Sequence, residues 1–343
     1  PVLFLAMGFV FLGALSFLFV PAVLLFLPAI VMVSLADGIR LPARNAVIQT
    51  NFSHRERSSV LGKLMLFSAT ALIAGILIGG RILNSNYLMY NGIFPLALMC
   101  LFMSNFILAN IPSKVKGKAT HRKFRLKNPF QPYKHLFRLL KEDRFFLMFE
   151  VGFFLYGCGF MTMMAMNPIY YYDKFNALPS QFGYTAVIMN VVLFLGPVVG
   201  RYADKRSNPM KLVALSFTAL AVFPLILYFC PGIMFAYGAH AWFSLGMVGV
   251  MMCWNLGPIF FAKNKDASSY IGIHVTLTGL RAMLILPLVG YIKENTTTFL
   301  PVFILATTMF LCAAAVMYFL NKRAGRSSKF HTTVSGRFET AGS

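Results

Sequence analysis

The residues of this sequence that could do chemistry are ionisable side chains inside long apolar stretches. Arg281 lies near the middle of the stretch 269–292, and His274 lies seven residues earlier on nearly the same helical face. Glu150 lies about a turn and a half into the stretch that begins at Phe145. In apolar surroundings a guanidinium group binds an anion or a buried acid, whereas a carboxyl or imidazole group carries a proton.

Neutral polar residues in the same stretches extend this set of candidates. Trp254 and Asn255 precede Gly257 and Pro258 in a stretch, 233–262, that is long enough to be broken at the proline. The candidates for substrate or cavity contact are therefore Arg281, His274, Glu150, Asn190, Asn167, Trp254 and Asn255.

Each ionisable candidate also has a plainer interpretation. Arg281 could form a structural salt bridge within a helical bundle, although a cavity or ion-pair role is favoured. Glu150 could extend to the membrane interface. His240 and His274 are each interpreted as histidines that pack between helices.

The composition defines the class of protein. Of the 343 residues, 58% are hydrophobic and only 12% are charged, although the net charge is +21. The mean hydropathy is +0.70. Soluble domains carry about 25% charged residues, so a soluble enzyme or a nucleic-acid-binding domain is excluded. Disordered chains lack this many apolar residues. The five cysteines are scattered singly and lack the spacing of a metal site.

Apolar stretches of about 20 residues, the length that spans a bilayer, recur along the whole chain. The first 36 residues carry no charge, which is too long for one span and predicts a turn at Pro21. The predicted spans are 1–19, 21–41, 59–81, 88–111, 145–169, 183–203, 211–230, 233–262, 269–292 and 299–320.

The basic residues fall on alternate breaks between these spans. One set of breaks, together with the C-terminal tail, holds 27 of the 31 Lys and Arg residues, and the other holds Arg81, Lys174 and Lys293. Because positive loops stay in the cytoplasm, the rich set is predicted to be cytoplasmic. The positive charge thus reflects topology and attraction to anionic lipid rather than nucleic acid.

The longest polar break, 112–144, divides four spans from six. Two equal six-helix halves would place two further helices before Pro1. The predicted organisation is 1–111 as the rest of an N-terminal half, 112–144 as a basic cytoplasmic central loop, 145–320 as a six-helix C-terminal half and 321–343 as a basic cytoplasmic tail.

The break after the sixth span contains Gly200, Ala203, Asp204 and Lys205, with Arg201 beside them. This pattern of Gly, two residues, a small residue, Asp and basic residues resembles the cytoplasmic loop signature of the major facilitator superfamily. The loop also follows the second helix after the central loop, as in that family. We interpret Asp204 as a cytoplasmic latch between helices; the alternative is a solvated turn.

Two further segments resemble the family. Asp37, Arg40 and Arg44 share one helical face where the fourth helix of the family ends. They are interpreted as a cytoplasmic anchor, with one side of a gate as the alternative.

Gly75, Gly79 and Gly80 are similar to the glycine motif of the fifth helix in proton antiporters of this family. Close helix packing suffices to explain these glycines and is favoured over antiport.

The resemblance implies an all-α polytopic membrane protein with about ten transmembrane helices of an expected twelve, beginning at the third helix of the family. It implies secondary active transport of a small solute by alternating access, with a coupled proton or other ion, in a plasma or bacterial inner membrane. No cofactor and no enzymatic activity are expected, and the partners are the solute and membrane lipids. The alternative is a non-transporting sensor or scaffold of the same fold.

The charge asymmetry predicts that the central loop and the tail share the cytoplasmic side. Ser113→Cys and Ser327→Cys, in a background without the native cysteines, should therefore resist a membrane-impermeant maleimide in intact cells. Permeabilised cells, in which both positions should react, provide the control. Labelling of either cysteine in intact cells would contradict the assignment.

Overall fold

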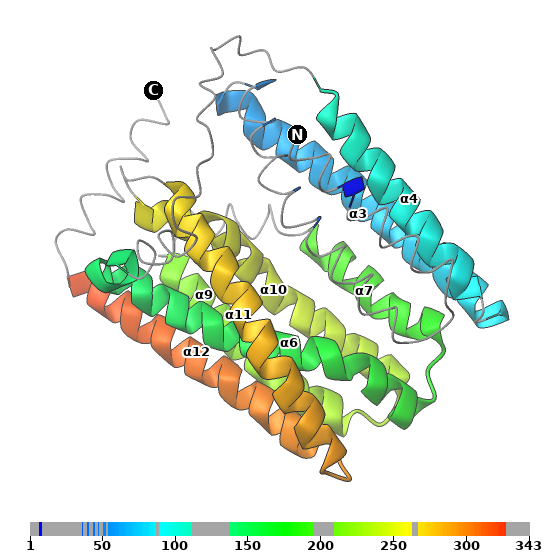
Figure 1. Ribbon diagram of the computed structural model, residues 1–343. Coiled ribbons are helices and arrows are strands. Elements are labelled where there is room, and N and C mark those ends of the chain that lie inside the picture. Colours follow the sequence, from blue (N-terminus) through cyan, green and yellow to red (C-terminus); the bar gives the residue numbers. More distant parts are fainter. Residues whose placement is uncertain are drawn as a thin grey trace. The chain divides into compact units, whose positions relative to one another are not determined.

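The computed structural model describes residues 7–8, 36, 40, 44, 47, 51–52, 54–86, 89–111, 138–194, 209–262 and 267–326. The regular elements in these ranges are helices, and no strand occurs among them (Figure 1). Seven of these helices are long and apolar enough to cross a membrane. The protein is therefore an all-α, multi-pass membrane protein.

The chain divides into two compact units, Pro1–Arg125 and Leu126–Ser343. The first unit contains α3 (His54–Ser85) and α4 (Tyr90–Ala109). Large apolar side chains of these two helices, among them Phe67, Ile78 and Leu96, are exposed, as suits helices that lie against lipid.

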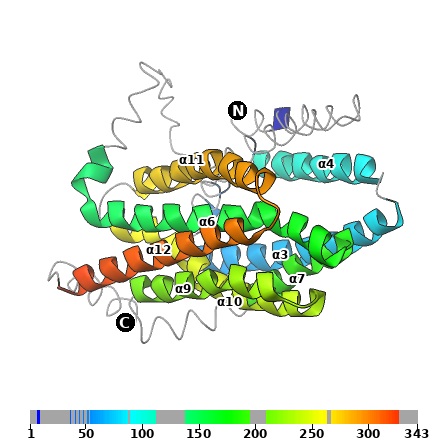
Figure 2. The same cartoon turned by 90° about the horizontal axis from the view of Figure 1, so that it is seen from below.

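The second unit is a bundle of helices around an apolar core. Its described helices are α6 (Arg144–Phe175), α7 (Pro179–Leu193), α9 (Pro209–Phe229), α10 (Ile233–Ala262), α11 (Ala267–Glu294) and α12 (Leu300–Arg326). α6 lies alongside both α11 and α12, α9 packs between α12 and α10, and α7 packs on α10 (Figure 1, Figure 2).

Aromatic rings fill the centre of this bundle. Tyr156 stacks on Phe217 of α9 with ring centroids 4.8 Å apart, and Phe153 meets the same ring edge-on at 5.4 Å. These side chains are buried. Offset and edge-to-face ring pairs stabilise packing beyond the area they bury, so these rings link α6 to α9.

The start of α6 is tied to α11. The backbone N–H of Phe146 donates a hydrogen bond to Asp143 Oδ1 (3.0 Å), which caps the helix. The hydroxyl of Tyr270 on α11 donates to the other carboxylate oxygen, Oδ2 (3.3 Å). One side chain thus begins α6 and sets its position relative to α11.

Several predicted spans coincide closely with helices. The span 233–262 is α10 itself, 88–111 contains α4, and 145–169 continues to Phe175 in α6. Most of the predicted spans 1–19 and 21–41 lies outside the described residues.

The stretch 233–262 is long enough to be broken at Pro258, but no break occurs there. α10 is one continuous helix with Pro258 inside it, because long apolar helices tolerate proline when neighbours compensate the lost hydrogen bond. The adjacent Gly257 serves packing, since a side chain there would overlap the ring of Phe149.

Candidate functional site

A glutamate and a histidine meet in the interior of the second unit. Both carboxylate oxygens of Glu150 on α6 lie 3.0 Å from Nδ1 of His274 on α11. The side chains are only 2% and 3% exposed. Glu150 therefore lies inside the protein, and the pair is a buried, charge-assisted contact between two helices.

Arg281 is buried two turns further along α11 and also contacts α6. It is 4% exposed, and its Nη1 donates a hydrogen bond to the backbone carbonyl of Phe153 (2.8 Å). The guanidinium group lies against Gly157, where any side chain would overlap it. A glycine at this position of α6 is thus what admits the arginine.

Trp254 of α10 contacts both His274 and Arg281. Its ring centroid lies 4.2 Å from that of His274 in an edge-to-face arrangement, and 5.2 Å from Cζ of Arg281. The latter is a cation–π contact, which is stronger where water is excluded. The rings of Phe149 and Phe153 lie 6.1 Å and 5.3 Å from the imidazole ring. We call Glu150, His274, Arg281 and Trp254 the buried cluster.

The charges of the buried cluster balance when the imidazole is neutral. With Glu150 ionised, it carries one negative charge and Arg281 one positive charge, whereas an added proton leaves a net positive charge. Two buried nitrogens, His274 Nε2 and Arg281 Nε, have no hydrogen-bond partner in the part of the chain described. The neutral imidazole can therefore accept a proton at Nε2, and Arg281 Nε remains as a donor for a ligand.

The other candidate residues of the second unit lie elsewhere. Asn167 is 17 positions beyond Glu150 on the same helix, about 25 Å away along the axis. Its Oδ1 is buried without a partner among the described residues. Asn190 Nδ2 donates to the carbonyl of Ala186 in its own helix (2.8 Å). His240 Nδ1 lies 3.0 Å from the hydroxyl of Tyr171. The side chain of Asn255 lies outside the described residues.

The predicted cytoplasmic residues are described only in part. Arg40 and Arg44 are half-buried. Positions 37, 200, 201, 204 and 205, which are Asp37, Gly200, Arg201, Asp204 and Lys205, lie outside the described residues, so the latch and the anchor stay predictions.

The glycine motif of α3 also stays a prediction. A side chain at Gly75 or Gly79 would meet no atom within 4 Å. Gly80 is buried. Among the described residues, no group of three metal-ligating side chains occurs.

The sequence marks Glu150 on α6 and His274 on α11 as candidates, but it predicts neither their pairing nor the role of Gly157. A signal was present in the spacing, because Glu150 and Gly157 are seven residues apart, as are His274 and Arg281. Equal spacing on two helices lets both pairs meet across one interface.

The model of a family described as Major Facilitator Superfamily matches residues 1–280. Among solved structures, a variant of the E. coli fucose:proton symporter FucP is 15% identical, with a TM-score of 0.55 over 93% of this chain and 84% of that one. A major facilitator superfamily transporter, FucP, in the outward conformation gives 13% identity and a TM-score of 0.58, over 93% and 83% of the two chains. These likenesses show a shared fold. No curated protein matches the sequence.

The close contact at Gly157 generates a stability prediction. Gly157→Ala should lower the free energy of unfolding by about 1–3 kcal/mol, because the added methyl group must displace the guanidinium of Arg281. The measurement is the thermal unfolding midpoint of the purified protein in detergent. Gly279→Ala, on the α11 side, is the control, because a side chain there meets no atom within 4 Å. Equal midpoints for the two variants would disprove the contact.

Proposed function

The chain belongs to the major facilitator superfamily, and from this membership we propose that it is a secondary active transporter of a small solute. In this proposal two six-helix halves, one containing 1–111 and one formed by 145–320, alternate access to a site between them. The central loop and the tail lie in the cytoplasm, and the membrane is a plasma or bacterial inner membrane. The similar fold of a fucose:proton symporter supports a proton as the coupled ion.

The observation that carries the proposal is the buried pair of Glu150 and His274. Ionisable groups inside membrane-spanning helices are costly, and their usual role is in transport pathways and proton relays. A carboxylate and an imidazole 3.0 Å apart share a proton readily. A sensor or scaffold of the same fold needs no such exchange, so the pair favours transport.

Protonation changes the energetics of the whole buried cluster. With a neutral imidazole, the carboxylate of Glu150 offsets the guanidinium of Arg281. An added proton removes that balance and leaves a buried positive charge, which is unfavourable in a low dielectric. An anionic group of the solute, accepting a hydrogen bond from Arg281 Nε, would restore the balance. Proton and solute then favour each other's binding, which is the requirement for symport.

The proton-coupling role predicts an uncoupled phenotype for Glu150→Gln. Solutes, including fucose, would be screened for uptake into proteoliposomes with and without a pH gradient. For a transported solute, Glu150→Gln should reduce gradient-driven accumulation by about 5- to 150-fold, because the carboxyl that carries the proton is gone. Exchange of solute across the membrane without a gradient should persist.

The matched control is Glu294→Gln, an exposed carboxyl at the end of α11. It should retain gradient-driven accumulation. Full accumulation by Glu150→Gln would refute the coupling role. A folded native protein that transports none of the solutes would instead favour the sensor or scaffold.

The role of Arg281 can be separated from simple charge balance. Lysine keeps the charge of Arg281 but loses the planar donor fork. If Arg281 Nε binds an anionic group of the solute, Arg281→Lys should raise the KM by about 10- to 100-fold, the effect of one lost charge-assisted hydrogen bond. Uptake kinetics in proteoliposomes measure this change. Arg323→Lys, at an exposed position on α12, is the control. A near-native KM for Arg281→Lys would mean that Arg281 contributes only its positive charge and does not bind the solute.

A further inference from the structure

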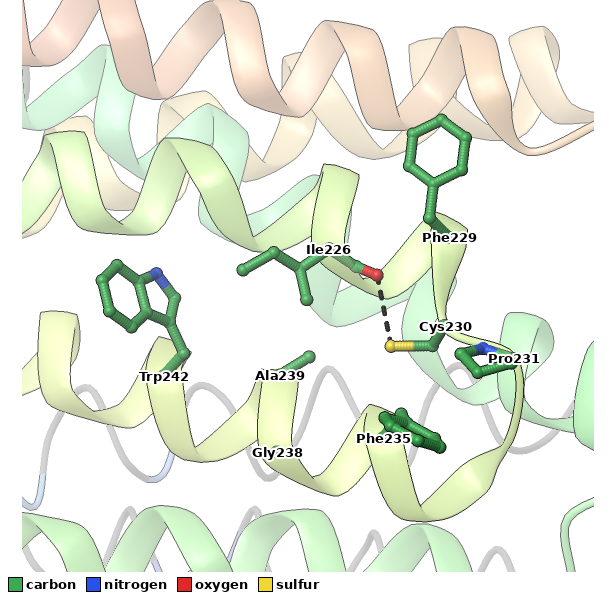
Figure 3. A pocket seen from close by; sticks show the side chains of 8 residues that line it. All are labelled: Ile226, Phe229, Cys230, Pro231, Phe235, Gly238, Ala239 and Trp242. Atoms are coloured by element: carbon green, nitrogen blue, oxygen red, sulfur yellow. Dashed lines mark hydrogen bonds between the residues drawn. The ribbon is translucent and has the colours of Figure 1, made fainter.

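A hollow of about 400 Å³ lies between the end of α9 and the start of α10, away from the buried cluster. Figure 3 shows its lining, which includes Ile226, Phe229, Cys230, Phe235, Gly238 and Trp242. Cavities that hold small organic ligands measure about 300–1,000 Å³, so this one is large enough for part of a ligand.

The lining of the hollow is apolar, and the polar hydrogens of Trp242 and Cys230 are already donated to backbone carbonyl groups. The indole N–H of Trp242 donates to the carbonyl of Ala219 (2.8 Å), so the indole presents only its ring. The thiol of Cys230 donates to the carbonyl of Ile226 (3.2 Å). Phe229 and Phe235 are 75% and 64% exposed. A ligand in this hollow therefore needs hydrocarbon rather than hydrogen-bonding groups.

Gly238 keeps the hollow open. A side chain built at Gly238 would meet no atom within 4 Å, so a larger residue can enter the hollow without disturbing the helix. From Phe235 to Trp242 the hollow follows α10 for about 10 Å along the helix axis. Its lining thus begins at a helix end and extends into a membrane-spanning segment.

A cationic group lies beside the end of α9. Nζ of Lys174 donates hydrogen bonds to the hydroxyl of Tyr170 (2.7 Å) and to the carbonyl of Tyr228. Tyr228 is two residues before Cys230, which lines the hollow. An ammonium group has three N–H donors, so the described contacts leave one for a ligand.

We propose that this hollow binds an acyl chain of an anionic phospholipid whose phosphate group accepts a hydrogen bond from Lys174. The charge of Lys174 complements an anionic headgroup, and its tyrosine neighbours are typical of the headgroup level of a membrane. The apolar hollow continues from that level inward, in the direction that an acyl chain takes. The site does not depend on the proposed transport function.

The two tryptophans of the chain make a direct test possible, because Trp242 lines the hollow and Trp254 lies in the buried cluster. Trp254→Phe leaves Trp242 as the only tryptophan. This variant is reconstituted in phosphatidylcholine membranes that also contain a lipid with brominated acyl chains. The brominated lipid is either phosphatidylglycerol or phosphatidylcholine, and its bromine atoms quench the fluorescence of a nearby indole. Brominated phosphatidylglycerol should associate about fivefold more strongly than brominated phosphatidylcholine, as expected for one lysine at an anionic headgroup.

Two further substitutions in this background test the two parts of the site. Lys174→Gln should remove the preference for phosphatidylglycerol. Gly238→Leu should reduce quenching by both lipids, because its side chain fills the hollow. Gly290→Leu on α11 is the matched control, since a side chain there also meets no atom within 4 Å but lies outside the lining. Equal quenching by the two lipids, or no effect of Gly238→Leu, would overturn the proposal.

A second measurement needs no tryptophan substitution. Phosphatidylglycerol that copurifies with the full chain in detergent is counted by mass spectrometry for the native protein and for the Lys174→Gln, Gly238→Leu and Gly290→Leu variants. The first two variants should retain about fivefold less lipid than the native protein, whereas Gly290→Leu should retain the same amount. Equal retention by all four proteins would also overturn the proposal.

Discussion

A charge inside a membrane-spanning bundle must find its partner within the protein, and this constraint shapes the contact between α6 and α11. Water, which would otherwise solvate the charges, is absent from the bilayer core. The contact has two levels: Glu150 meets His274, and one helical heptad further Arg281 meets the backbone of α6. Because the levels follow in the same order on both helices, α6 and α11 run parallel. The register of the two helices is therefore fixed by polar contacts rather than by apolar packing alone.

Much of the surrounding structure serves this contact. Asp143 links the start of α6 to Tyr270, which sets the same pair of helices before the charged residues begin. α10 contributes Trp254 to the cluster, and its Gly257 leaves room for Phe149, which lies beside the imidazole. Glycine is therefore used on α6 and α10 for one purpose, the close approach of large side chains to a helix backbone.

Some features of this structure could be predicted from the sequence, and others could not. The bounds of α10 follow from hydropathy, because an uninterrupted apolar length is a local and strong signal. The continuity of α10 through Pro258 depends on neighbouring helices and could not be read locally. The burial of Arg281 follows from its position in the middle of a span, whereas its partner does not. The pairing of Glu150 with His274 joins residues 124 positions apart, so it depends on a helix register that only tertiary packing defines.

The balance of charge in the cluster gives the proposed transport cycle its energetic basis. Removing one partner of a buried ion pair typically costs about 3–5 kcal/mol, because a charge is left uncompensated. Reversing a two-state equilibrium from about 1:99 to 99:1 requires about 5.5 kcal/mol of differential binding. In the proposed cycle, a proton on the pair of Glu150 and His274 would therefore supply only part of this free energy. The remainder would come from the solute, so that neither ligand alone would drive the complete change. That dependence on both ligands would keep the proposed symporter from leaking either one.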